Sequence, residues 1–168
     1  MKRRLGTPEE TILTVKGNLA ITYAKLGRLQ EANRELQDVY SGYLKLKGEE
    51  NIDALRAACN YAYSLLQLRR FEEAKPLLRK TMPVARRVFG AEHRLTLKMR
   101  QNYAEAFFKD DGATIDELRE TVTSLEETTR IARRVLGGTN PVAKEIGENL
   151  LLARAALRAR ETPPPGSS

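Results

Sequence analysis

The chain has 168 residues, of which 41% are hydrophobic, a length and composition that suit one domain with a sizeable core. No apolar run approaches the roughly 20 residues that cross a bilayer, and no signal-peptide pattern follows the opening MKRRLGTPEE. A single cysteine, Cys59, cannot form an internal disulfide. We therefore expect a cytoplasmic protein without a membrane segment.

The net charge of +7 and the sequence pI near 9.7 raise the question of a nucleic-acid or acidic partner. Many basic residues, however, stand just before a glycine, where cations complement the dipole at a helix C-terminus. These pairs are Lys45 with Lys47, Arg86 with Arg87, and Arg133 with Arg134. Few aromatic residues accompany them, so the charge pattern argues against nucleic-acid binding.

The first predicted element is a helix that begins at Pro8, after a capping threonine, Thr7, and with Glu10 three residues beyond the cap. The run NLAITYAKLGRLQEA continues this helix, turns at Gly27-Arg28 and opens a second helix that ends before Gly48. Apolar residues follow a step of three to four through both segments, which predicts a helical hairpin.

The following elements repeat this plan, with turns expected around Arg69-Arg70 and at Asp110-Asp111-Gly112. Pro83 falls inside the predicted second helix of the second unit and is expected to kink it. Thr114 opens a capping box with Glu117 and a longer helix to about Val135. Asn140-Pro141 starts a last helix to about Arg160, and 162–168 are expected to form a disordered Pro/Gly/Ser tail.

Asparagines and glycines recur with one period along the chain. Asn18, Asn60, Asn102 and Asn149 are separated by 42, 42 and 47 residues, and so are Gly6, Gly48, Gly90 and Gly137. Repeats of this length indicate a solenoid, in which each unit buries its apolar face only by stacking on its neighbours. We expect repeats at about 6–47, 48–89 and 90–136, a half repeat at 137–161, and a single domain over 1–161.

The run G-x-x-H-x-x-T-L at Gly90–Leu97, followed by N-Y-A at Asn102, resembles the 42-residue tetratricopeptide repeat of kinesin light chains. So do the Glu-Ala pairs at 31–32 and 73–74, Lys75-Pro76-Leu77-Leu78, and the endings ARRVFG and ARRVLG. This resemblance implies an all-α, right-handed solenoid of antiparallel hairpins, with three full repeats and a C-terminal capping helix. It also implies a non-catalytic scaffold that binds proteins or peptides.

The resemblance places the four asparagines on the first helix of each unit, along the concave face. An amide offers a donor and an acceptor, which suits pairing with an extended peptide backbone. Alternatively, the amides serve only packing within the solenoid. The same face carries Thr14, Arg56, Lys98 and Glu145 one turn earlier, and Ile21, Tyr63, Glu105 and Leu152 one turn later. The expected peptide-binding set is Asn18, Asn60, Asn102, Asn149, Arg56, Lys98 and Tyr63, with the two cations facing an acidic partner.

Catalytic signals are weak in this sequence. His93 is the only histidine and precedes a predicted helix, which favours a capping role, while Cys59 has no evident base partner. No Cys or His cluster has metal-ligand spacing, and no phosphate-binding loop is present. We expect no enzymatic activity, no cofactor and no metal.

The last helix carries two apolar rows. Val142, Ile146, Leu150, Ala153 and Leu157 are expected to pack on the third unit. A second row, Leu152, Ala155, Ala156 and Ala159, lacks the partner helix of a full repeat. Either this row faces water or it contacts another protomer, so a homo-oligomer through the C-terminal helix is the alternative to a monomeric peptide-binding scaffold.

Overall fold

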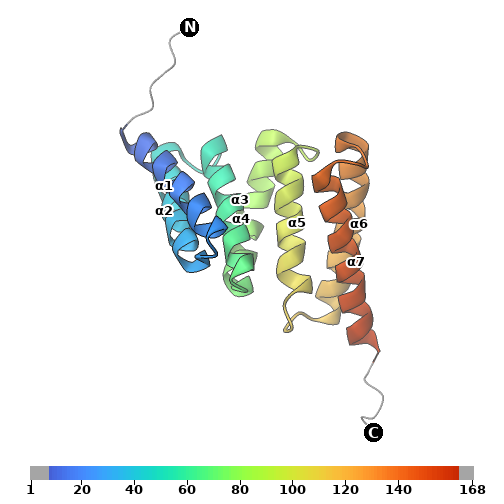
Figure 1. Ribbon diagram of the computed structural model, residues 1–168. Helices are drawn as coiled ribbons and strands as arrows, with labels where there is room; N and C mark the ends of the chain where they lie inside the picture. The colour runs from blue at the N-terminus through green and yellow to red at the C-terminus, as the bar shows by residue number, and fades with distance from the viewer. Residues whose placement is uncertain (1–7, 163–168) are drawn as a thin grey trace.

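The computed structural model describes residues 8–162, and these form seven helices without a strand. Their bounds are α1 Pro8–Lys25, α2 Leu29–Lys47, α3 Ile52–Gln67, α4 Phe71–Phe89, α5 Arg94–Phe108, α6 Ile115–Leu136 and α7 Pro141–Glu161. Figure 1 shows a row of antiparallel helix pairs with the two chain ends at opposite ends of the row. The predicted all-α solenoid is confirmed.

Side-chain caps explain where several helices begin. The Thr114 hydroxyl accepts from the Glu117 backbone N–H, while the Glu117 carboxylate accepts from the Thr114 N–H, so the predicted capping box is present. Asn140 accepts from the Val142 N–H, and His93 Nδ1 accepts from the Leu95 N–H, as expected of local caps. The predicted cap at Thr7 lies outside the described residues.

Glycines with positive φ explain where the helices end. Gly48, Gly90 and Gly137 follow α2, α4 and α6 with φ of 83°, 93° and 87°, which a residue with a side chain adopts only under strain. The predicted basic pairs occupy the last turns of the same three helices. Arg69, at the turn position equivalent to Gly27, also takes a positive φ of 56°. Pro83 lies within the continuous helix α4.

Each junction between units is an apolar interface. Met99 of α5 is fully buried against Leu55 and Ala58 of α3 and Leu78 of α4. In the same way, Ile146 of α7 packs into the cluster formed by α5 and α6. The first helix of a later unit thus covers both helices of the unit before it, which is how a solenoid builds a continuous core.

The first unit departs from this regular stacking. The Cα atoms of α3 and α5 approach within 8 Å of one another, and so do those of α5 and α7. No Cα atom of α1 lies within 8 Å of a Cα atom of α3, although both helices pack on α2. The first helix therefore stands apart from the row of first helices, and the space beside it is described below.

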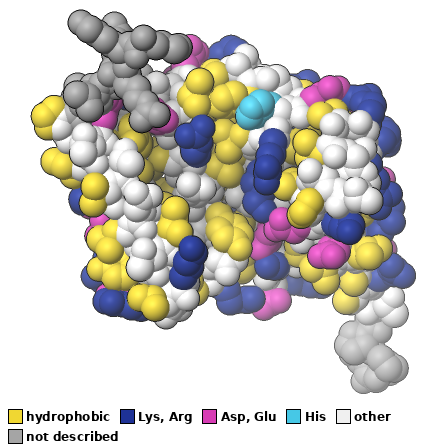
Figure 2. All heavy atoms as spheres, turned by 45° about the horizontal axis from the view of Figure 1, so that its top comes forward, with side chains coloured by type: hydrophobic (Ala, Val, Ile, Leu, Met, Phe, Trp, Pro, Cys, Tyr) yellow, Lys and Arg dark blue, Asp and Glu magenta, His cyan; other side chains and the backbone are white. Residues whose placement is uncertain are grey.

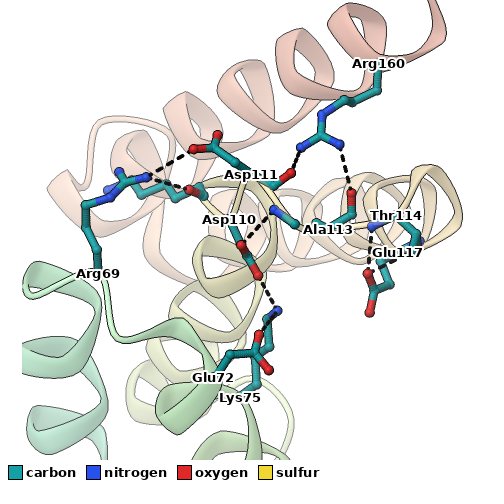
Figure 3. A network of polar contacts seen from close by, with 11 residues as sticks. Arg69, Glu72, Lys75, Asp110, Asp111, Ala113, Thr114, Glu117 and Arg160 are labelled. Carbon is teal, nitrogen blue, oxygen red and sulfur yellow. Dashed lines mark hydrogen bonds and ion pairs between the residues drawn. The ribbon is translucent and has the colours of Figure 1, made fainter.

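Polar contacts join the loops at one edge of the stack (Figure 3). Lys75 of α4 is buried and donates to Asp110 at 2.6 Å and Glu72 at 2.8 Å. Asp110 also accepts from the Gly112 N–H at 2.9 Å, and Arg160 of α7 donates to the backbone carbonyls of Ala113 and Asp111. The α5–α6 loop is thereby anchored to both the second unit and the last helix.

The last helix packs through its expected row. Val142, Ile146, Leu150 and Ala153 are buried, and Leu157 is half-buried. The second row is largely outside: Leu152, Ala155 and Ala159 are exposed and Ala156 is half-buried. Of the predicted tail, 163–168 lie outside the described residues. Among residues 8–162, no helix is long and apolar enough to cross a membrane.

Candidate functional site

The four repeating asparagines occupy equivalent positions on α1, α3, α5 and α7, but their environments differ. Asn18 and Asn60 are exposed, whereas Asn102 is 0% exposed and Asn149 is 8% exposed. A row of four amides that are all accessible to a ligand is therefore not what the structure contains. Only the first two are open to a ligand here.

Contact between first helices explains the burial of Asn102. Its Nδ2 donates to the Cys59 carbonyl of α3 at 3.5 Å and lies 3.7 Å from the Cys59 sulfur. Asn149 stands at the equivalent place on α7, which packs on α5. Asn60 escapes burial because α1 does not cover it. The bland interpretation of the amides, packing within the solenoid, thus fits Asn102 and Asn149.

Burial also defines the chemistry of the single cysteine. Cys59 is 4% exposed, and this burial raises the pKa of its thiol to about 12. A thiol with such a pKa stays protonated near neutral pH and is a poor nucleophile. Cys59 therefore behaves as a small core residue.

A groove of about 460 Å³ opens between α1 and α3. Its walls are mainly apolar and come from the first two units. The lining residues are Ile21, Ala24, Lys25, Leu29, Ala32, Leu36, Asn60, Tyr63, Ser64 and Gln67. Figure 2 shows hydrophobic side chains along the left of the view, over the N-terminal helices. A concave, largely apolar surface with a few polar groups is the usual form of a binding site.

The polar groups in the groove are unequally available. Ser64 is already engaged, because its hydroxyl accepts from Asn33 Nδ2 at 2.6 Å and donates to the Tyr61 carbonyl at 2.8 Å. The Asn60 side chain forms no hydrogen bond with any residue of the range 8–162. Asn60 is therefore the amide that could pair with a bound molecule.

Two predicted cations lie on the same helices as the groove or beside it. The Arg56 side chain is 64% exposed, and Asp53 lies 3.7 Å from it. Lys98 of α5 donates to both carboxylate oxygens of Glu145, at 3.0 and 3.1 Å, and lies 5.6 Å from the centre of the Tyr63 ring. Arg56 therefore has more of its charge available to a ligand than Lys98 has.

The structure thus brings together Asn60 and Tyr63 in one groove, with Arg56 on the same helix and Lys98 against the Tyr63 ring. Sequence reasoning missed the contribution of α1 and α2, in particular Lys25, Leu29 and Leu36. One signal was available: apolar residues are spread around much of α1, as Ile12, Val15, Leu19 and Ile21 show. Such a helix has more apolar surface than one neighbour can cover.

Comparison with known proteins adds family information to this geometry. The sequence model of the tetratricopeptide repeat matches residues 10–82 and 53–112, which together cover more than half of the chain. A search of curated protein sequences finds no match.

Two solved structures share the fold. One is a kinesin light chain of Podosopora anserina with nearly identical tetratricopeptide-like repeats, at 23% identity and a TM-score of 0.75. The alignment covers 90% of this chain and 69% of that one. The other is BtubC (BKLC) from P. vanneervenii, at 14% identity and a TM-score of 0.59, covering 99% of this chain and 72% of that one. At these identities the likeness concerns the fold.

Proposed function

This chain belongs to the tetratricopeptide repeat family, a general scaffold for protein–protein interaction, and from that premise we propose that it binds an acidic, extended peptide segment without catalysis. The segment lies in the groove between α1 and α3. The observation that carries the proposal is the exposed and unpaired Asn60 amide on the wall of an otherwise apolar groove. Tyr63 and Ile21 supply apolar walls for one peptide side chain.

The Asn60 amide supplies orientation. An extended peptide presents a backbone N–H and a carbonyl, and one amide group can pair with both. Such pairing costs little, because Asn60 gives up only water and no protein partner when the peptide binds. The buried Asn102 and Asn149 act in this proposal only through the packing of α5 and α7.

The charges beside the groove select acidic residues. Lys25 lines the groove, Arg56 lies one helical turn before Asn60, and Lys98 lies against Tyr63. A carboxylate near Arg56 gains a charge-assisted hydrogen bond, while Lys98 has to share its ammonium with Glu145. The overall charge of +7 adds a longer-range attraction for acidic peptides that weakens with salt.

The test is a selection of displayed random dodecapeptides against the full chain, followed by titration of the enriched peptides. We expect enrichment of Asp and Glu beside an apolar residue, and a roughly tenfold weaker Kd for Asn60→Ala and for Arg56→Glu. Tyr63→Ala should weaken binding by a similar factor because it removes a wall of the groove.

Arg134→Glu is the matched control for Arg56→Glu, because it changes the net charge equally at a residue outside the groove. Its Kd should change less than twofold at 0.15 M salt. Failure to enrich any peptide, or equal losses for Arg134→Glu and Arg56→Glu, would contradict the proposed site.

A further inference from the structure

The outward side of α1 carries three exposed aliphatic residues, Ile12, Val15 and Leu19, which we call the N-terminal end face. Ile12 is 56% exposed, Val15 61% and Leu19 38%. They lie on one side of the helix because their spacing of three and four residues follows the helical period. This side is distinct from the groove, to which α1 contributes Ile21, Ala24 and Lys25.

The repeat register shows what this face corresponds to. The residue 42 positions after Val15 is Ala57, and the next equivalents are Met99 and Ile146, all of which are 4% exposed or less. Met99 and Ile146 reach this burial by packing on the preceding unit. The N-terminal end face is therefore a stacking surface of the solenoid that, in the described part of the chain, nothing covers.

The opposite end of the stack has a different character. The positions of Leu55 and Leu97, both buried, are taken in α7 by Lys144, and those of Cys59 and Gln101 by Glu148. Both α7 residues are exposed. A charged outer surface of this kind is what a terminal cap of a solenoid requires. Self-association through α7 is therefore less favourable than association through α1.

We propose that the N-terminal end face is the contact surface of a two-fold homodimer, in which α1 of one copy packs on α1 of a second copy. Three observations favour this occupant. The face carries no charged residue among Ile12, Val15 and Leu19, so it can meet itself without like-charge repulsion. Within the chain, first helices already pack on first helices at the α3–α5 and α5–α7 junctions. Head-to-tail stacking on α7 would instead bury Lys144 and Glu148 against aliphatic side chains, at a desolvation cost.

The size of the face sets the strength of the dimer. A helix of 18 residues is about 27 Å long, and a single pair of such helices buries less than the roughly 1,200 Å² of a stable interface. We therefore expect a reversible dimer with a Kd in the range of roughly 10⁻⁵ to 10⁻³ M, typical of small contacts. Closure by a two-fold axis also means that association stops at two copies.

Sedimentation equilibrium of the full chain from 10⁻⁵ to 10⁻³ M tests the proposal. The wild-type chain should shift from monomer to dimer, and Val15→Glu should remain monomeric with an unchanged far-UV circular dichroism spectrum. Leu151→Glu is the matched control: Leu151 is 62% exposed, on α7 at the other end, and its variant should dimerise like the wild type.

Three results would overturn the proposal. They are a wild-type chain that stays monomeric throughout this range, association that Leu151→Glu abolishes and Val15→Glu does not, and a mass that grows beyond the dimer. The peptide titrations described above report on the other side of α1, so this proposal and the peptide-binding proposal can fail separately.

Discussion

Replacing Asp110 by alanine tests how the polar loop network stabilises the stack. Asp110 lies in the turn between α5 and α6 and accepts from the Lys75 ammonium at 2.6 Å and from the Gly112 N–H at 2.9 Å. The Lys75 side chain is only 11% exposed, and its other acceptor, Glu72, has a side chain that is 84% exposed. The substitution leaves a nearly buried ammonium with one solvated partner.

The expected loss of stability follows from these two contacts. A hydrogen bond to a charged group contributes about 1.5–3 kcal/mol, and one to a backbone N–H about 0.5–1.5 kcal/mol. Water can replace part of the second contact, since Gly112 is exposed. We therefore expect Asp110→Ala to lower the free energy of unfolding by about 2–4 kcal/mol.

Urea denaturation followed by circular dichroism at 222 nm measures this difference, with the midpoint and the slope reported separately because repeat arrays can unfold in parts. Asp111→Ala is the matched control. Its side chain is 99% exposed and 3.7 Å from Arg69, so its loss should stay below about 0.5 kcal/mol. Equal losses for the two variants would refute the reasoning.

The same variant predicts a pH dependence. The hydrogen bond from Lys75 holds the pKa of Asp110 below its usual value. A carboxylate with a lowered folded-state pKa stabilises the fold fully above its unfolded pKa, near 3.9, and this contribution is lost as the pH falls through the folded-state pKa. The stability difference between wild type and Asp110→Ala should therefore be constant from pH 5 to 7 and shrink below about pH 4. A difference that persists undiminished at pH 2 would contradict this sign.

Three further measurements test local features of the fold. Cys59 should react with a soluble disulfide reagent at pH 8 at least about 100-fold more slowly in the folded chain than in urea, because burial raises the pKa of its thiol to about 12; comparable rates would show that the thiol is accessible. Thr114→Ala should cost about 0.5–2 kcal/mol in the same urea assay, because it removes the capping box, whereas Thr123→Ala on the exposed face should cost less than 0.5 kcal/mol. Gly17→Ala should raise the free energy of unfolding by about 0.5–1 kcal/mol because no atom lies within 4 Å of the new methyl group, and Gly42→Ala should lower it because its methyl group would lie 2.4 Å from Leu13; a gain for Gly42→Ala would show that α1 yields freely.

Much of the fold could be predicted from the sequence because helix punctuation is local. The glycines after α2, α4 and α6 and the caps at Thr114 and Asn140 act on neighbouring backbone groups, so one residue type at one position suffices to place a boundary. The 42-residue period then orders the helices, since each unit repeats the same apolar positions.

The candidate site could be predicted only in part. The repeat register placed Asn60 and Asn102 at equivalent positions, and the sequence around them is almost the same, NYA in both copies. Their accessibility nevertheless differs completely, because α5 presses Asn102 onto Cys59 while α1 leaves Asn60 open. Exposure is a property of neighbouring helices, which a residue's own repeat does not encode.

The sequence by itself determined that the chain is a stack of helical hairpins, because capping, glycine punctuation and apolar spacing are interactions within a few residues of the backbone. Only the tertiary structure decided that α1 stands away from α3 and that a groove therefore opens beside Asn60 and Tyr63. It also decided that the apolar stacking face is open at the N-terminal end while Lys144 and Glu148 cover the other end with charge. Burial depends on the summed positions of all the helices around a side chain, so it emerges only once the units are stacked.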